Sequence, residues 1–381
     1  MRKRLFVACV LGLAAVSAAA ERVAVPHGRL EALNGYTVVS VEGTPEEMGT
    51  AYGTLLKPVI QRVVKAMITD GVCAEKEARE NILKGSRVME RFQPQEFIAE
   101  LKAIAKAAEV SYDDLLLLQY FGDVRRCITG PGGSMLCTSF AILPPLTKGR
   151  ICLVGRNFDY FDNGVGEYAS ILAHYRPKGR IGFVTVTWAG VINGWTLLSE
   201  RGIVTSNNTA FGARSQSLEG ISTCNLLRYV AERAGTVAEG IELVRKGPRA
   251  CGTCILVASG NPPDAALIEF DHEGMAVRRP KEGFVGAANS YFELYQEPAG
   301  ADPYWGRIGT ARDLARKGNL DFSCNIAGAD GVPIEGMNLH SVMIDATALR
   351  LKVAMGKIPA CKLPYRAFRL TRDGLEVGVR P

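Results

Sequence analysis

The residues best suited to chemistry in this chain are a cysteine, an arginine and an aspartate that stand close together in the sequence. Cys137 opens a short run of small and apolar residues, and Arg156 and Asp159 follow a second run rich in Ile, Leu and Val. A segment of turn composition, Pro-Pro-Leu-Thr-Lys-Gly, separates the two runs. The pattern predicts a β-hairpin with strands at 137–143 and 150–157 around a turn at 144–149.

The register of this hairpin decides what Arg156 does. If Leu143 faces Arg150, antiparallel pairing places Cys137 opposite Arg156, at a Cβ separation of about 5 Å. An arginine at that distance favours the thiolate over the thiol. Asp159 then lies just past the strand end, near the backbone nitrogen of Cys137. A one-residue slip turns Arg156 to the other face, and an ordinary hairpin with a buried cysteine and a surface arginine has the same spacing.

The approach to Cys137 is rich in glycine. Gly130-Pro131-Gly132-Gly133-Ser134 ends a mainly helical stretch and predicts a flexible linker. Such a linker either joins two parts of the fold or forms a processing site that exposes Cys137 as a new N-terminus, and the two interpretations are compatible.

The Cys137-Thr138 pair, followed one hairpin later by Gly155-Arg156-Asn157-Phe158-Asp159, resembles the N-terminal-nucleophile (Ntn) cysteine amidohydrolases. The closest similarity is to the acyl-CoA:isopenicillin N acyltransferase family, with bile-salt (choloylglycine) hydrolases and acid ceramidase as more distant relatives. The hairpin turn is a few residues longer than in the bile-salt hydrolases. The resemblance extends over most of the chain but is dense only at 137–160.

The resemblance implies an α+β fold, the αββα sandwich of two stacked antiparallel sheets flanked by helices. It also implies that the chain cuts itself between Leu136 and Cys137. The free α-amino group of Cys137, which titrates near pH 8, then acts as the base for its own thiol. In the uncut chain, the thiol attacks the preceding carbonyl in an N-to-S acyl shift.

Acyl chemistry also needs hydrogen-bond donors for a developing oxyanion. Asn208 and Asn289 each end a predicted strand and resemble the two oxyanion-site asparagines of the family, with Asn207 as the alternative to Asn208. Arg307 resembles an arginine of the family that supports the nucleophile or a substrate carboxylate, and Arg312 is its alternative. Without the resemblance, asparagines at strand ends are usual in turns, and an arginine at a helix start is usual on a surface.

The N-terminus has the pattern of a secretory signal at 1–20. Arg2-Lys3-Arg4 precedes an apolar stretch that is too short to span a membrane, and Ala18-Ala19-Ala20 resembles a cleavage site. Removing it lowers the 45 basic residues to 42 against 39 acidic ones, so nothing suggests a nucleic-acid partner. No later stretch is long and apolar enough for a membrane span. We therefore expect a secreted or periplasmic protein.

Nine cysteines remain after removal of the signal, and in an oxidising compartment some are expected to pair. The odd number leaves at least one unpaired, as a catalytic thiol would be. Cys251-Gly252-Thr253-Cys254 has the spacing of a redox pair or half a zinc site, but a structural disulfide or free core cysteines are the favoured interpretation.

The expected organisation is a mainly helical fragment, 21–136, followed by a catalytic fragment, 137–381, that begins at the nucleophile. Thr44 with Glu47 forms a capping-box pattern at the start of the first helix, and Thr236 with Glu239 forms another. The expected early elements are a strand near 36–41 and helices from 45, at 75–91, at 95–108 and from 111. Strands, two helices, more strands, a helix near 303–317 and a last hairpin at 340–354 follow, an order that favours layered α+β architecture.

The sequence therefore predicts an exported, self-processing enzyme that needs no cofactor or metal. Its partners would be a small linear amide substrate and its own N-terminal fragment. It would cleave the amide, or transfer its acyl group, through a thioester on Cys137, with hydrolysis favoured because an exported enzyme meets little acyl-CoA. Two alternatives remain: a non-catalytic binding or scaffold protein that retains the fold, and a Cys–His thiol hydrolase in which His340 is the best candidate.

Overall fold

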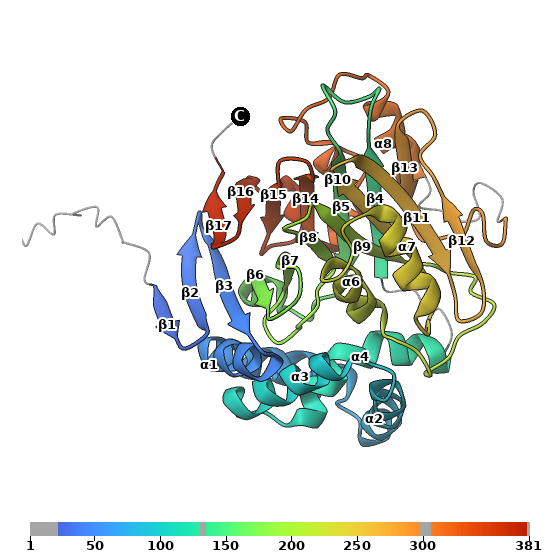
Figure 1. Ribbon diagram of the computed structural model, residues 1–381. Coiled ribbons are helices and arrows are strands. Elements are labelled where there is room, and N and C mark those ends of the chain that lie inside the picture. Colours follow the sequence, from blue (N-terminus) through green and yellow to red (C-terminus); the bar gives the residue numbers. More distant parts are fainter. Residues whose placement is uncertain (1–21, 130–134, 297–305, 379–381) are drawn as a thin grey trace, which may run out of the picture.

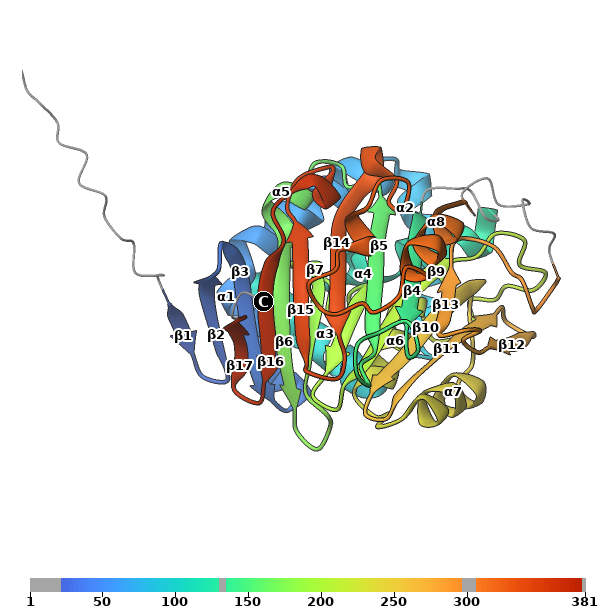
Figure 2. The same cartoon turned by 90° about the horizontal axis from the view of Figure 1, so that it is seen from above.

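Two β-sheets lie face to face at the centre of the molecule, and helices cover their outer faces (Figure 1). The computed structural model describes residues 22–129, 135–296 and 306–378, so the predicted signal at 1–20 and the linker at 130–134 lie outside the described residues. Viewed from above, β14 and β15 of one sheet run in much the same direction as β6 and β7 of the other (Figure 2). The predicted αββα architecture is confirmed.

Sheet A contains ten strands within the described residues, in the order β1-β2-β3-β6-β7-β8-β9-β10-β11-β12. Neighbours pair antiparallel except β3 and β6, which are parallel, so the prediction of purely antiparallel sheets is wrong for this pair. The strands span Val23–Val25, Gly28–Leu33, Tyr36–Gly43, Ser170–Pro177, Phe183–Trp188, Thr196–Ser199, Ile203–Thr209, Thr253–Gly260, Pro263–Phe270 and Met275–Arg278.

Sheet B contains seven described strands in the order β13-β4-β5-β14-β15-β16-β17. All of its pairs are antiparallel. The last hairpin predicted from the sequence, β14 and β15, is followed by a further hairpin, β16 and β17, that the sequence analysis missed. In the order along the chain, β4, β5 and β13 to β17 span Met135–Ile142, Leu153–Tyr160, Phe284–Ala287, Asn338–Asp345, Arg350–Met355, Arg366–Thr371 and Gly374–Val377.

Most helices pack on the outer face of sheet A, and α8 covers the outer face of sheet B (Figure 1). The capping box at Thr44 forms as predicted: Glu47 N donates to Thr44 Oγ1, and Thr44 N donates to Glu47 Oε2. The helices α1 to α8 span Pro45–Val63, Lys76–Glu90, Gln95–Ala108, Tyr112–Thr129, Gly166–Ala169, Thr223–Ala231, Val237–Lys246 and Gly306–Ala315, and a π-helical segment, Val64–Val72, extends α1.

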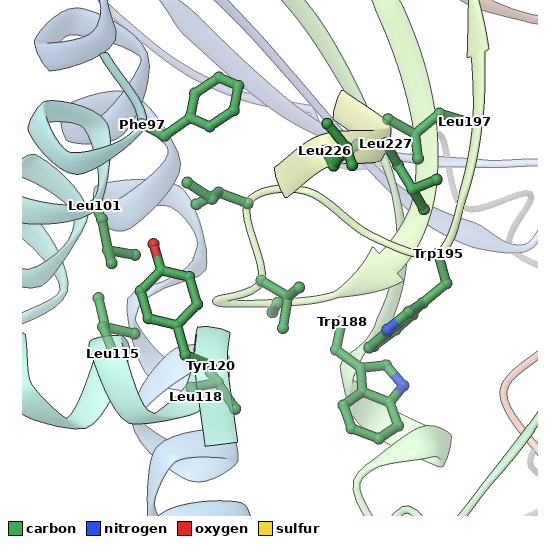
Figure 3. Packing of buried hydrophobic residues seen from close by; sticks show 14 of the residues in the cluster. Phe97, Leu101, Leu115, Leu118, Tyr120, Trp188, Trp195, Leu197, Leu226 and Leu227 are labelled. Atoms are coloured by element: carbon green, nitrogen blue, oxygen red, sulfur yellow. The ribbon is translucent and has the colours of Figure 1, made fainter. Parts of the chain in front are cut away.

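Three apolar layers hold these elements together. Figure 3 shows the first, in which side chains of α3, α4 and α6 pack beside Trp188 and Trp195. The second lies between the sheets and includes Val154 of sheet B and Leu256 of sheet A. The third, between sheet B and α8, includes Phe140 and Ile308. Burial of apolar area at about 25 cal/mol per Å² is the main stabilising contribution of such layers.

The N-terminal part of the chain is not a separate domain. Its first three strands extend sheet A, because β3 pairs with β6 of the C-terminal part. Its helices α1, α3 and α4 cover the outer face of the same sheet, in one continuous apolar cluster with residues of β6, β7 and β10. The two segments on either side of Cys137 therefore share one core.

The hairpin that carries Cys137 differs from the predicted one in its register. Cys137 pairs with Phe158, and Ser139 pairs with Arg156. The predicted pairing of Cys137 with Arg156 is wrong by two positions because β5 begins at Leu153 rather than at residue 150, after a longer connection. Side chains alternate with a period of two, so this even shift keeps Arg156 on the same face of the sheet as Cys137.

Candidate active site around Cys137

Cys137 lies near the start of β4, with 1% of its surface exposed. Its neighbour two residues on, Ser139, accepts a hydrogen bond from Ser206 of sheet A, so both Ser139 and Cys137 face the space between the sheets. The sulfur of Cys137 accepts a hydrogen bond from Arg156 Nη2 at 3.1 Å. The backbone nitrogen of Cys137 donates to Asn289 Oδ1 at 3.0 Å. The thiol and the nitrogen that self-cleavage would free are thus held by two different groups.

Arg156 is fully buried, and among the described residues no carboxylate lies within ion-pair distance of it. Its Nη1 atom donates to the carbonyl of Asn157 at 2.7 Å, its Nη2 atom donates to Cys137, and its Nε atom has no hydrogen-bond partner among the described residues. The guanidinium also lies 5.6 Å from the centre of the Phe158 ring. A buried cation is costly without a counter-charge. Loss of the Cys137 proton would supply that counter-charge at hydrogen-bond distance.

Burial nevertheless raises the pKa of the Cys137 thiol in the uncut chain. The Arg156 charge and hydrogen bond lower this pKa, but they only partly offset burial, and the Asp159 carboxylate raises it further. The expectation that Arg156 favours the thiolate is correct in direction, whereas the net shift favours the thiol. The thiol of Cys137 is therefore favoured in its neutral form, and a nucleophilic role would require a base.

A polar network lies on the opposite face of sheet B and is centred on Arg307 of α8. Its Nη2 atom donates to Asn289 Oδ1 at 2.9 Å, and its Nη1 atom donates to Thr138 Oγ1 at 2.8 Å and lies 3.4 Å from Asp159 Oδ2. Arg307 therefore reaches the Cys137 nitrogen through the Asn289 oxygen. Arg312, the alternative, has a half-exposed side chain that pairs with Asp313 at 3.6 Å, outside this network.

Asp159 lies within β5, opposite Leu136, rather than past the strand end. Its carboxylate accepts hydrogen bonds from Asn338 Nδ2 at 2.7 Å and from Ile334 N at 3.1 Å. Burial raises the pKa of Asp159 to about 6, although Asn338 and Arg307 favour the charged form. Asp159 is connected to the Cys137 nitrogen through Arg307 and Asn289, and Asn289 is the acceptor for that nitrogen.

The two neighbouring asparagines of β9 face opposite ways. Asn208 shares the face of Ser206, and its Nδ2 atom donates to the carbonyl of Ala287 in sheet B at 3.1 Å. Its Oδ1 atom has no hydrogen-bond partner among the described residues. Asn207 alternates to the helix-covered face. Asn208 is therefore the one on the Cys137 side of sheet A, and Asn289, whose Nδ2 atom donates to the carbonyl of Thr209 at 2.7 Å, joins the two sheets beside it.

His340 does not approach Cys137 as a thiol hydrolase would require. It pairs with Phe158 in the β5–β14 ladder, while Cys137 pairs with Phe158 from the other side. The imidazole stacks on Phe158 and its Nε2 atom hydrogen-bonds to Thr196 Oγ1 at 2.9 Å. Burial and the Arg156 charge hold the pKa of His340 well below its usual range. It is a neutral ring that packs beside the site, so the Cys–His alternative is not supported.

Two polar residues of the network were missed from the sequence. Thr138 stood within the recognised motif but had no role assigned to it; its hydroxyl accepts from Arg307 and donates to the carbonyl of Val332 at 3.1 Å. Asn338 had no sequence signal, because it stands far along the chain from the hairpin. It reaches Asp159 only because β14 pairs with β5.

A small cavity of about 50 Å³ lies close to the residues around Cys137, and aromatic rings form much of its wall. Trp195, one of these rings, stacks on Phe158 at 4.3 Å, next to Cys137 in the ladder. Cys224, on another wall, is close enough to Cys137 and Arg156 for their charges to influence its pKa, which burial raises. The wall residues include Leu118, Phe121, Asp123, Tyr160, Trp188, Asn193, Trp195 and Cys224.

Among the residues that the structure describes, no three His, Cys, Asp or Glu side chains are grouped as metal ligands. Within the same residues, no helix has the length and apolar character needed to cross a bilayer. Cys251 and Cys254 do not face each other as a redox pair would: Cys251 faces Cys127, while the thiol of Cys254 points to the carbonyl of Ser290. Both are buried free cysteines, one of the two interpretations favoured from the sequence.

Residues 146–317 match the model of the family described as acyl-coenzyme A:6-aminopenicillanic acid acyl-transferase. The matched segment is less than half of the chain. It includes Arg156, Asp159, Asn208, Asn289 and Arg307 and begins shortly after Cys137. The similarity to Ntn acyltransferases inferred from the sequence is confirmed, and it supports an acyl-transferring or amide-hydrolysing enzyme.

Two curated proteins are similar over longer stretches. An uncharacterized protein of Archaeoglobus fulgidus is 25% identical over 280 residues, which cover 66% of this chain and 47% of that protein. Protein dcd1B of Dictyostelium discoideum is 21% identical over 280 residues, which cover 67% of this chain and 54% of that protein. The chain thus spans about half the length of these curated relatives.

Among solved structures, a mutant of conjugated bile acid hydrolase from Clostridium perfringens is 12% identical, with a TM-score of 0.45. The alignment covers 64% of this chain and 97% of that one. Because the TM-score is below 0.5, the fold assignment rests on the strand pairing and layers described above.

Proposed function

We propose that this chain is an exported, self-processing cysteine hydrolase that cleaves small linear amides through a thioester on Cys137. The observation that supports this most strongly is that two different side chains form hydrogen bonds with the sulfur and the backbone nitrogen of Cys137. Arg156 contacts its sulfur, and Asn289 accepts from its backbone nitrogen. An inert core cysteine needs neither a buried cation at its sulfur nor a separate acceptor for its nitrogen.

Self-processing would begin in the uncut chain. The Cys137 thiol loses its proton, and the sulfur attacks the carbonyl carbon of Leu136. The carbon–nitrogen bond breaks, the nitrogen takes up a proton and becomes the α-amine of Cys137, and a thioester joins Leu136 to the sulfur. Water then hydrolyses the thioester, which frees the carboxylate of Leu136 and regenerates the thiol.

Amide turnover would use the same sulfur with the new α-amine as base. The amine titrates near pH 8, takes the thiol proton and returns it to the leaving amine of the substrate. The acyl group stays on the sulfur as a thioester until water releases it as an acid. Asn289 Oδ1 is placed to hold the α-amine, and Arg307 in turn holds that oxygen. Asn208 is the candidate donor to the oxyanion from the facing sheet.

The acyl group of the substrate would enter the aromatic cavity that includes Trp188, Trp195 and Tyr160. Apolar walls with a few polar groups are typical of small-molecule sites. In the uncut chain, Met135 and Leu136 pair with β5 beside this cavity. Cleavage would free this end of the strand from β5 at Tyr160, a wall residue of the cavity, so we expect processing to open access to the proposed substrate site.

The decisive experiment is N-terminal sequencing together with intact-mass analysis of purified protein expressed with its leader. We expect two fragments, one of which begins at Cys137, and an N-terminus near Glu21 that reports removal of the leader. The Cys137→Ala variant is the control and stays uncut. An active wild-type protein that remains a single uncut chain would contradict self-processing.

The substrate class is tested with a panel of N-acyl amides that differ in acyl chain and amine. Hydrolysis releases the free acid, whereas acyl transfer to an added amine produces a new amide, so chromatography separates the two outcomes. A fully cut protein that turns over no amide in the panel, and that binds panel members without converting them, would instead favour a non-catalytic binding role.

A further inference from the structure

Two cysteines on opposite sides of the proposed cut face each other. Cys127 lies in the last part of α4, within the proposed N-terminal fragment, and Cys251 precedes β10 in the catalytic fragment. Their sulfur atoms are 3.1 Å apart. A disulfide bond is about 2.05 Å long. Small side-chain rotations that move the two sulfur atoms about 1 Å closer together would therefore bring them to bonding distance.

We propose that Cys127 and Cys251 form a disulfide that covalently joins the two fragments. The disulfide itself needs no cleavage at Cys137, but its role as a link between fragments rests on the proposed self-processing. An oxidising compartment, as expected for an exported protein, is where such bonds form and persist.

The backbone around the two sulfurs is already held in place. The thiol of Cys127 points to the carbonyl of Ser217 at 3.5 Å, and Ser217 N donates to the carbonyl of Ala250, next to Cys251. The thiol of Cys251 points to the carbonyl of Asp123, one turn before Cys127 on α4, at 3.4 Å. Cys251 thus contacts the helix that carries Cys127, and Cys127 contacts a segment that is hydrogen-bonded to the loop of Cys251, so bond formation requires little movement.

Arg126 adds hydrogen bonds between α4 and the loop that carries Cys251. Its Nη1 atom donates to the carbonyl of Gly252 at 2.9 Å, and its Nη2 atom contacts Asp123 and Thr223. Asp123 in turn accepts from the backbone nitrogen of Thr223 at 2.7 Å. This buried pair ties α4 to both the Cys251 loop and the start of α6. Its guanidinium charge favours the Cys251 thiolate, but the hydrogen bond with Cys127 and burial outweigh it and raise the pKa of the Cys251 thiol well above its usual range.

The exposure of the two thiols suggests the order of bond formation. Cys127 is partly exposed, whereas Cys251 has 1% of its surface exposed. The Cys127 thiolate would attack a disulfide oxidant, such as oxidised glutathione, and one oxidant thiol would leave. Cys251 would then lose its proton as its sulfur attacks the mixed disulfide, and the second oxidant sulfur would take up a proton and leave as a thiol. The two cysteines lose two protons and two electrons in total, and the oxidant disulfide is reduced to two thiols.

The Cys127–Cys251 disulfide would keep the two fragments together after cleavage between Leu136 and Cys137 has weakened their association. Cleavage frees the end of the chain that follows α4, so only non-covalent contacts hold α4 to the catalytic fragment. A disulfide close to this new end would keep α4 against the cavity wall to which it contributes Leu118, Phe121 and Asp123. The substrate site, which both fragments form, would then persist at any dilution.

The test is peptide mapping and gel analysis of the purified full chain, oxidised with glutathione disulfide and then blocked with an alkylating agent. We expect a linked peptide containing Cys127 and Cys251 that is lighter by two hydrogens than the reduced peptides together. The cut protein should run as one band without reductant and as two bands with it. Cys127→Ser should run as two bands in both conditions, and Cys73→Ser, in the same fragment, should behave as wild type.

The uncut Cys137→Ala variant separates this proposal from self-processing. It should contain the same linked peptide even though it is a single chain. Absence of the linked peptide from both oxidised wild type and oxidised Cys137→Ala would overturn the disulfide, whatever the state of the cut. A single non-reduced band that persists in cut Cys127→Ser and in cut Cys251→Ala would show that another bond makes the link, and would also overturn it.

Discussion

Arg156 contacts the sulfur of Cys137 from a diagonal position, since the residue directly opposite Arg156 is Ser139. A long side chain can bridge the diagonal of an antiparallel pair, where separations are about 7–8 Å. The shift of the hairpin by two residues therefore preserves the contact that the sequence predicted by a different pairing. It also leaves Phe158 directly opposite Cys137, where its ring stacks with Trp195.

Replacing Arg156 tests the electrostatic part of this contact. We expect Arg156→Gln to raise the apparent pKa of the Cys137 thiol, because the cation that favours the thiolate is removed. Charges at this distance typically shift a pKa by about one to three units. The measurement is the rate of inactivation of the cut enzyme by iodoacetamide as a function of pH. Arg312→Gln, a surface change, is the control, and equal midpoints in the two variants would contradict the assigned role.

Replacing Cys137 tests the nucleophile. Cys137→Ala should abolish both self-cleavage and amide turnover, whereas Cys137→Ser should cut slowly and turn over poorly. A hydroxyl is a weaker nucleophile than a thiol near neutral pH. Gel analysis over time and product assays measure the two activities. Cys152→Ser, which changes a buried cysteine just before β5, is the comparison; wild-type turnover by Cys137→Ala would exclude Cys137 as the nucleophile.

Asn289 is expected to matter for the reaction more than for substrate binding. Asn289→Ala removes the acceptor of the Cys137 nitrogen and one acceptor of Arg307. If Asn289 also acts as an oxyanion donor, as the family resemblance implies, we expect kcat to fall on the order of 10²–10³-fold, the cost typical of losing one such donor, with a much smaller change in KM. The variant is assayed after the cut is confirmed and its Tm is compared with wild type. A folded, fully cut variant with kcat within about twofold of wild type would remove Asn289 from the site.

Asn207 and Asn208 provide a matched pair within one strand. Asn208 faces sheet B and donates to the carbonyl of Ala287, whereas Asn207 faces the helices. We therefore expect Asn208→Ala to lower kcat more than Asn207→Ala, by at least about tenfold if Asn208 stabilises the oxyanion. Steady-state kinetics of both variants, with Tm values alongside, measure the difference. A larger loss in Asn207→Ala would reverse the assignment.

His174 should make the fold sensitive to acid. It is buried in β6 with neither ring nitrogen hydrogen-bonded among the described residues, and burial lowers its pKa from 6.5 to about 4, with Arg29 and Arg176 adding to the effect. The neutral ring is favoured in the folded state, so its contribution is present above pH 6.5 and is lost as the pH falls toward 4. The full shift corresponds to about 3 kcal/mol.

The expected result is that His174→Leu loses less stability than wild type between pH 7 and pH 4, by up to about 3 kcal/mol. Urea unfolding at several pH values measures this difference. His27→Asn, which changes an exposed histidine, should follow the wild-type curve. Parallel curves for wild type and His174→Leu would show that His174 does not titrate differently in the folded state.

The local elements were predictable from the sequence because short-range patterns define them. The capping box at Thr44 formed as expected, since it needs only residues three apart. The hairpin at Cys137 was recognised from its apolar runs and turn, and the layered architecture followed from the order of strands and helices. The predicted register of this hairpin was wrong because turn composition does not show where the second strand begins, and β5 starts three residues later than predicted.

Contacts between distant segments were decided only by the tertiary structure. The family resemblance named Asn289 and Arg307, but only the packing of α8 on sheet B brings Arg307 and the Asn289 oxygen to the Cys137 nitrogen. Asn338 reaches Asp159 because β14 pairs with β5, and Cys127 meets Cys251 because α4 packs beside the loop before β10. The sequence by itself determined which residue types stand in the hairpin and near strand ends. Which of them meet depends on long-range strand pairing and helix packing, and these depend on burial summed over the whole chain rather than on any local pattern.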